Sequence, residues 1–147
     1  TIAFIVSYAI GPIAMSTLRE TAPDVERPFR LPYARVVSPL AFCVSSLLLF
    51  WETWPLTGEM LGVLLVGVLV YAYYVVRGRA TLDSVKNGVW LVAYLVAMAA
   101  LSFLGDANFG GVGVIPFGWD FLAVVLVSLG FYYWGTRRGV PYDPQRA

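Results

Sequence analysis

Side chains capable of catalysis or metal binding are scarce in this sequence of 147 residues. It contains no His and a single Cys, Cys43, so it lacks the usual general base, the commonest metal ligand and the partner for an internal disulfide. No nucleophile lies at a spacing that would pair it with a base. We therefore expect neither an enzyme nor a metal or cofactor site. The formal net charge of +1 gives no basic field for nucleic acid.

Four residues near the start of the chain have the most suggestive spacing. Ser7 and Tyr8 bring hydroxyl groups into an apolar stretch, and Gly11-Pro12 follows them. Pro lacks the backbone N–H and crowds the preceding turn, so we expect a kink or a break there. One interpretation is a helix that lines a substrate path or gate. The other is a kinked packing helix whose hydroxyls bond to a neighbouring helix, and the residues alone leave both open.

The segment 19–35 is the second candidate. It combines four Arg and three acidic residues with three Pro, which bias the chain to extended conformations. The near balance of charge argues against a polybasic lipid tether. The arginines either only fix membrane topology or form a structural latch.

The stretches of sequence without charged residues indicate which helices hold these candidate residues. Of all residues, 59% are hydrophobic and 13% are charged, with a mean hydropathy of +0.74. Charge-free runs of 16 to 19 residues alternate with short charged segments, and the apolar/polar alternation of a barrel strand is missing. In hydrocarbon such runs must be helical. We predict an all-α membrane protein with five transmembrane helices at about 1–18, 36–54, 60–76, 87–105 and 119–136.

The basic residues predict the orientation of these helices. All ten Lys and Arg lie in the segments 19–35, 77–86 and 137–147, whereas the loops at 52–59 and 106–118 hold none. The positive-inside rule then places the loop 19–35 and the tail 137–147 in the cytoplasm. We expect the Gly-rich outer loop 106–118 to be a flexible turn or a short re-entrant segment. Aromatic residues at helix ends, among them Trp51, Trp119 and Tyr132, fit interfacial belts.

The segment 7–32 carries a specific combination, S-Y-x-x-G-P followed by L-R and then P-D-x-x-R-P-F-R-x-P. Its members are Ser7, Tyr8, Gly11, Pro12, Leu18, Arg19, Pro23, Asp24, Arg27, Pro28, Phe29, Arg30 and Pro32. This pattern resembles the amino acid–polyamine–organocation permeases, in particular the bacterial branch that resembles aspartate:proton symporters. Weaker likeness continues through Phe50-Trp51, Phe109-Gly110-Gly111 and Tyr132-Tyr133-Trp134.

The resemblance implies the C-terminal part of a LeuT-type inverted-repeat transporter in the plasma or inner membrane. The first helix would be the tenth of that fold, the next two the eleventh and twelfth, and the last two additional spans. The implied partners are the lipid bilayer, the N-terminal helices of the same permease, an amino acid substrate, a coupling proton and a second protomer. The family's substrate and ion sites lie mainly on other helices.

Thr1 opens inside an apolar run, which is the pattern of a piece of a longer protein. The alternative is a stand-alone membrane subunit of five helices, or an assembly partner, without transport activity.

Overall fold

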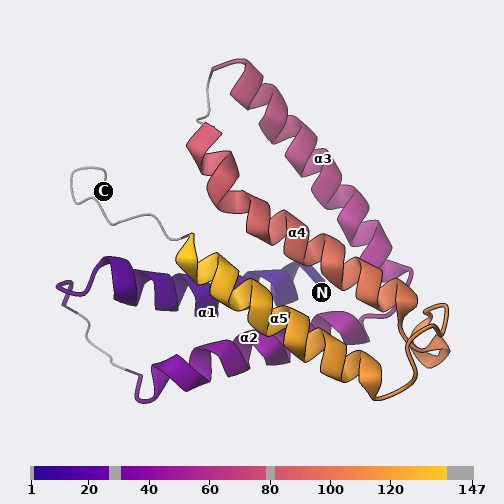
Figure 1. The fold of residues 1–147 in the computed structure, drawn as a ribbon. Helices are drawn as coiled ribbons and strands as arrows, with labels where there is room; N and C mark the ends of the chain where they lie inside the picture. Colours follow the sequence, from indigo (N-terminus) through magenta and orange to yellow (C-terminus); the bar gives the residue numbers. More distant parts are fainter. Residues whose placement is uncertain (1, 27–30, 79–81, 139–147) are drawn as a thin grey trace.

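The computed structural model describes residues 2–26, 31–78 and 82–138, and this part of the chain is all-helical. Figure 1 shows five α-helices and one short 3-10 turn, η1. They are α1 (Ile2–Thr21), α2 (Ala34–Trp51), α3 (Leu56–Val76), α4 (Leu82–Leu104), η1 (Ala107–Phe109) and α5 (Trp119–Arg137). The all-α class with five helices is thus confirmed. Helices α3 and α4 begin before the charge-free runs, since Glu59 lies in the first turn of α3 and α4 starts at Leu82.

Three helices are long and apolar enough to cross a membrane, judged over the described residues. They are Ala34–Trp51, Leu56–Val76 and the segment Asn87–Leu104 of α4. Helices α1 and α5 fall outside this set. Arg19 and Glu20 lie near the C-terminal end of α1, and Asp120 lies in the first turn of α5.

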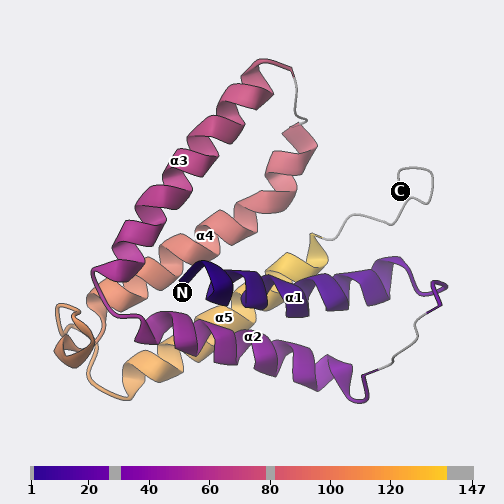
Figure 2. The same cartoon turned by 180° about the vertical axis from the view of Figure 1, so that it is seen from behind.

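Helices α1, α2 and α5 lie side by side, and the hairpin of α3 and α4 projects away from them (Figures 1 and 2). Helix α2 is central, since it contacts α1, α4 and α5. The C-terminal half of α4 packs on α5, while α3 contacts α4. Beyond Thr57, the described side chains of α3 are exposed or half-buried. An apolar helix with so little protein cover is suited to contact lipid.

The buried core joins four of the five helices. Phe42, Leu49 and Phe50 of α2 form its centre. The remaining members come from α1, α4 and α5: Ala9, Ile13, Tyr94, Leu95, Met98, Val124 and Tyr132. Tilted ring contacts link Phe42 to Tyr94, at 5.1 Å between centroids, and to Tyr132, at 5.9 Å.

Hydroxyl groups pair with each other inside this core. The Ser46 hydroxyl donates to the Phe42 carbonyl at 2.8 Å, so the Tyr94 hydroxyl, 2.7 Å from Ser46 Oγ, is the donor of that second bond. Thr57 Oγ1 and Ser102 Oγ lie 3.4 Å apart. Such pairs satisfy polar groups that a hydrocarbon solvent cannot.

The loop 106–118, which was expected to be a flexible turn or a short re-entrant segment, makes backbone hydrogen bonds to neighbouring segments. The backbone N–H groups of Val112 and Ile115 donate to the carbonyls of Phe103 and Leu104 at 2.8 and 3.0 Å, which satisfies the C-terminal end of α4. The Trp54 N–H donates to the Phe109 carbonyl at 3.1 Å and ties this loop to the α2–α3 connection. Four Phe rings, those of Phe50, Phe109, Phe117 and Phe121, pack around this tie.

Two observations explain why a glycine, Gly110, follows Phe109 at this hydrogen bond between the loop and the α2–α3 connection. Its φ of 78° is left-handed, and a Cβ there would fall on the Trp54 carbonyl oxygen. We predict that Gly110→Ala lowers the free energy of unfolding by about 1–3 kcal/mol. The measurement is chemical or thermal unfolding in detergent. Gly62→Ala is the control, since a Cβ at Gly62 meets nothing within 4 Å. Equal stability of the two variants would contradict the close packing of Gly110 against the Trp54 carbonyl.

Candidate functional site

Helix α1 presents the first set of predicted site residues on one exposed face. Ser7 and Gly11 are exposed, Pro12 is half-buried, and Tyr8 is 71% exposed. The opposite face buries Ala9 and Ile13 against the core. The structure therefore brings Ser7, Tyr8 and Gly11 together, on the side of α1 that the other described helices leave uncovered.

The helix α1 runs unbroken from Ile2 to Thr21 through Pro12. The expectation of a break at Gly11-Pro12 is thus wrong, although Pro12 still has no N–H to donate to the preceding turn. Burial of Ala9 and Ile13, one on each side of Pro12, holds both halves of the helix on the same core.

The position of Tyr8 raises a physical problem for a helix in lipid. Tyr8 lies 13 residues before the end of α1, which is about 20 Å along the helix axis. A phenol at that depth needs a polar partner, or water, that hydrocarbon does not supply. This face of α1 therefore fits cover by further protein or by an aqueous path better than cover by acyl chains.

The structure describes only part of the motif in the segment 19–35. Arg19 lies half-buried in the last turn of α1, and Pro23, Asp24 and Pro32 are exposed. The other four members, Arg27, Pro28, Phe29 and Arg30, lie outside the described residues. The structure thus places Arg19 against the helices but brings no other described motif residue to it.

Arg19 instead lines a cavity together with residues that are not part of the motif. This cavity of about 360 Å³ lies at one end of α1, α2 and α5, and we name it the arginine pocket. Its polar lining residues are Ser16, Arg19, Glu20, Arg35, Tyr132, Tyr133 and Thr136. Ser16 Oγ and the Tyr132 hydroxyl lie 2.6 Å apart and connect α1 to α5.

Sequence reasoning did not find the contact between two of these residues. Tyr132, which was expected in an interfacial belt, is 4% exposed, and its hydroxyl is bonded to Ser16. Ser16 continues the buried stripe of Ala9 and Ile13 at helical spacing, and this was the available signal. Arg35 is one of the four Arg of the segment 19–35, but the sequence did not show that it would line the same pocket as Arg19.

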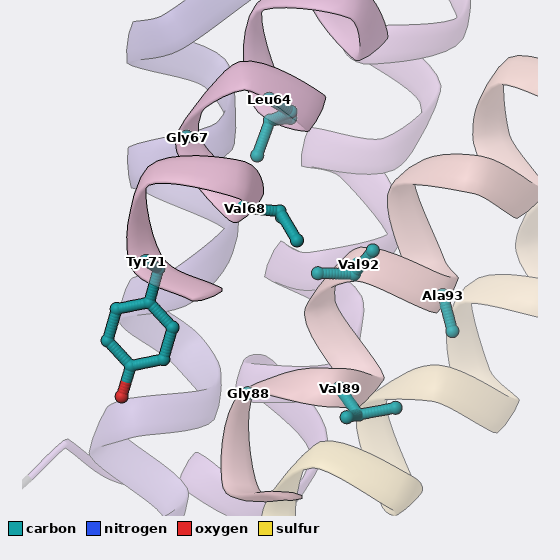
Figure 3. Close-up of a pocket in the computed structure, with 8 residues that line it drawn as sticks. All are labelled: Leu64, Gly67, Val68, Tyr71, Gly88, Val89, Val92 and Ala93. Atoms are coloured by element: carbon teal, nitrogen blue, oxygen red, sulfur yellow. The ribbon is translucent and has the colours of Figure 1, made fainter. Parts of the chain in front are cut away.

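A second groove has a different chemistry. It measures about 570 Å³ and lies between α3 and α4, where Val68 and Val92 point toward one another (Figure 3). Gly67 and Gly88 keep it open, since a Cβ at either position would meet nothing within 4 Å. Apolar residues form almost all of its lining, with the Tyr71 hydroxyl at the edge. Such a groove offers no recognition of a charged substrate.

Metal chemistry has no support in the described part of the chain. Over residues 2–26, 31–78 and 82–138, no three His, Cys, Asp or Glu residues come together. Buried Cys43 is a free thiol packed in the core.

Known proteins that resemble this chain share one activity. Over 141 residues, 95% of its length, the chain is 43% identical to the glutamate/serine transporter AimA of Bacillus subtilis strain 168. Over 146 residues, 96% of its length, it is 34% identical to the aspartate-proton symporter of the same organism. This chain is a homologue of bacterial amino acid transporters. It spans only 26% and 28% of those two proteins.

No family model and no solved structure matches this transporter homologue. The relatives confirm the resemblance to amino acid permeases that the segment 7–32 indicated. They are transporters and not enzymes, and they do not favour the stand-alone subunit. With three helices apolar enough to span, the homologue is a multi-pass membrane protein.

The Ser16–Tyr132 contact gives a prediction about how the arginine pocket is held together. In a double-mutant cycle, Ser16→Ala and Tyr132→Phe should show a coupling free energy of roughly 0.5–1.7 kcal/mol, the range for hydroxyl pairs between membrane helices. The measurement is reversible unfolding in detergent or bicelles. Tyr133→Phe paired with Ser16→Ala is the control, since Tyr133 is exposed. Coupling of the control pair as large as that of Ser16 with Tyr132 would contradict the contact.

Proposed function

We propose that this chain is the C-terminal part of a secondary active amino acid transporter. The observation that carries the proposal is its 43% identity to a glutamate/serine transporter over 95% of the chain. The second relative is an aspartate-proton symporter, which supports coupling to protons. The mechanism is alternating access, in which one bundle of helices rocks against another around a central site.

Within such a transporter we assign the five helices by their resemblance to the LeuT type. Helix α1 is the tenth span, α2 and α3 are the eleventh and twelfth, and α4 and α5 are two further spans. The substrate and proton sites then lie on N-terminal helices outside this chain. The five charge-free runs support this assignment, because intramembrane charge usually marks an ion pathway. In this family the eleventh and twelfth spans also make the contact with a second protomer.

The proposed orientation places the arginine pocket at the cytoplasmic side. Arg19 and Arg35 both line it, and Arg137 ends α5 next to the lining residue Thr136. At the other end, the loop at Asp106 is tied to the α2–α3 connection, which contains Glu52. This separation of charges supports a cytoplasmic C-terminus in the plasma membrane of the cell.

The exposed face of α1 is the part of this chain that we assign to the permeation path. Ser7, Tyr8 and Gly11 lie on it, and Pro12 weakens the hydrogen-bond ladder beside it. Contact with the moving bundle explains why a phenol and a glycine occur on this face, where acyl chains would favour larger apolar side chains. The face of α1 that carries Ala9 and Ile13 is the one that fixes the helix to the scaffold.

Two glycines give a matched test in the full-length transporter. A Cβ at Gly11 of α1 or Gly62 of α3 would meet nothing within 4 Å in this chain. We predict that Gly11→Leu lowers uptake of labelled glutamate, aspartate or serine roughly ten- to hundredfold by overpacking a contact of about 1–3 kcal/mol. Gly62→Leu should leave uptake unchanged, because α3 projects away from α1 (Figures 1 and 2). The amount of each variant in the membrane is measured in parallel.

Normal uptake by the Gly11→Leu variant would contradict the assignment of the exposed face of α1 to the permeation path. Absence of amino acid uptake in the unmodified transporter would overturn the proposed function itself.

A further inference from the structure

The arginine pocket has no part in the transport cycle proposed above. Two guanidinium groups, those of Arg19 and Arg35, line it together with one carboxylate, that of Glu20. Its volume of about 360 Å³ is far larger than the ~30 Å³ share of one water molecule. A cavity of this size with an excess of positive charge can hold a polyatomic anion.

The start of α2 adds to the positive potential. Ala34, the first residue of α2, lines the pocket, and the first turn of this helix holds no acidic residue. Its N-cap residue, Tyr33, makes no side-chain capping bond. The N-terminus of an 18-residue helix therefore directs its positive dipole end at the pocket.

Two helix C-termini, which carry the negative end of the helix dipole, lie at the same end of the bundle, and a nearby Arg offsets each of them. Helices α1 and α5 end there, and each has an Arg in its last turn, Arg19 and Arg137. These guanidiniums offset the negative C-terminal dipole ends. The net field thus favours an anion even after every helix terminus is counted.

The surroundings favour a lipid over a free anion. Leu18 and Val36, the neighbours of the two arginines in the sequence, are 52% and 58% exposed. Tyr133, which also lines the pocket, is exposed and precedes Trp134 on the part of α5 expected at the interface. Exposed apolar side chains one position away in sequence from the two pocket arginines match an amphiphile with a charged head and acyl tails.

We propose that the arginine pocket binds the phosphate of an anionic phospholipid from the cytoplasmic leaflet, with phosphatidylglycerol as the simplest member of that class. Arg19 and Arg35 donate to the phosphate oxygens, the start of α2 contributes its dipole, and the acyl chains lie along Leu18 and Val36. Basic pockets between helices on the cytoplasmic side are suited to lipid headgroups. The inference rests on the proposed orientation in the membrane and does not depend on which amino acid is carried.

The test uses the full-length transporter, purified and titrated with phosphatidylglycerol in phosphatidylcholine nanodiscs or followed by native mass spectrometry. The double variant Arg19→Gln, Arg35→Gln should weaken binding about tenfold or more, given the contribution of each Arg to anionic lipid binding. The matched control, Arg137→Gln with Arg138→Gln, removes the same charge at the same end of the bundle. These two residues do not line the pocket, so the control should lower affinity clearly less than the Arg19→Gln, Arg35→Gln pair does.

The second variant, Arg19→Lys with Arg35→Lys, guards against misfolding because it keeps the charge. It should bind phosphatidylglycerol more tightly than the Gln pair and less tightly than the unmodified protein. Equal losses in the Gln pair and its control would overturn the pocket in favour of diffuse surface charge. Displacement of the lipid by an equal concentration of inorganic phosphate would overturn the lipid assignment. Amino acid uptake, measured separately, reports on the proposed function and not on this site.

Discussion

The requirement that polar groups find partners inside the protein governs this structure. In hydrocarbon no water satisfies a backbone N–H or a hydroxyl, so long stretches must be helical and side-chain charge must lie at the helix ends. The sequence obeys this rule with charge-free runs separated by short charged segments. The core obeys it with hydroxyl pairs such as Ser46 with Tyr94, 2.7 Å apart.

These hydroxyl pairs also explain how helices associate without help from the hydrophobic effect. Lipid tails are as apolar as Leu, so packing and hydrogen bonds between helices must supply the specificity. Ser46 joins α2 to α4, Ser16 joins α1 to α5, and Thr57 approaches Ser102 between α3 and α4. At the loop end, the Trp54 N–H bond to the Phe109 carbonyl serves the same purpose with backbone groups.

The helices could be predicted from the sequence because each depends on its own run of residues. The stretch Val36–Trp51 holds no charge and falls inside α2, and the only large differences are at ends such as Leu82, where a charged turn extends the helix. The candidate face of α1 was also predictable, since Ser7 and Gly11 are four residues apart. Both predictions depend only on residues that are close together in the sequence.

What the sequence did not reveal depends on contacts between distant segments. Tyr132 has the composition of an interfacial residue, and only the packing of α1 on α5, 116 positions away, turns it into a buried partner of Ser16. Arg35 and Arg19 line one pocket through the same kind of packing between distant segments. The unbroken α1 has a similar cause, because tertiary burial on both sides of Pro12 outweighs one missing hydrogen bond.

The most direct test of this account is the sidedness of single cysteines in the full-length protein with Cys43→Ser. Asp24, Arg77 and Asn108 are replaced one at a time, and intact cells are treated with a maleimide that does not cross membranes. The account predicts labelling at Asn108 from outside, with labelling at Asp24 and Arg77 only after the cells are opened. Labelling of Asp24 and Arg77 from opposite sides of the membrane would contradict it.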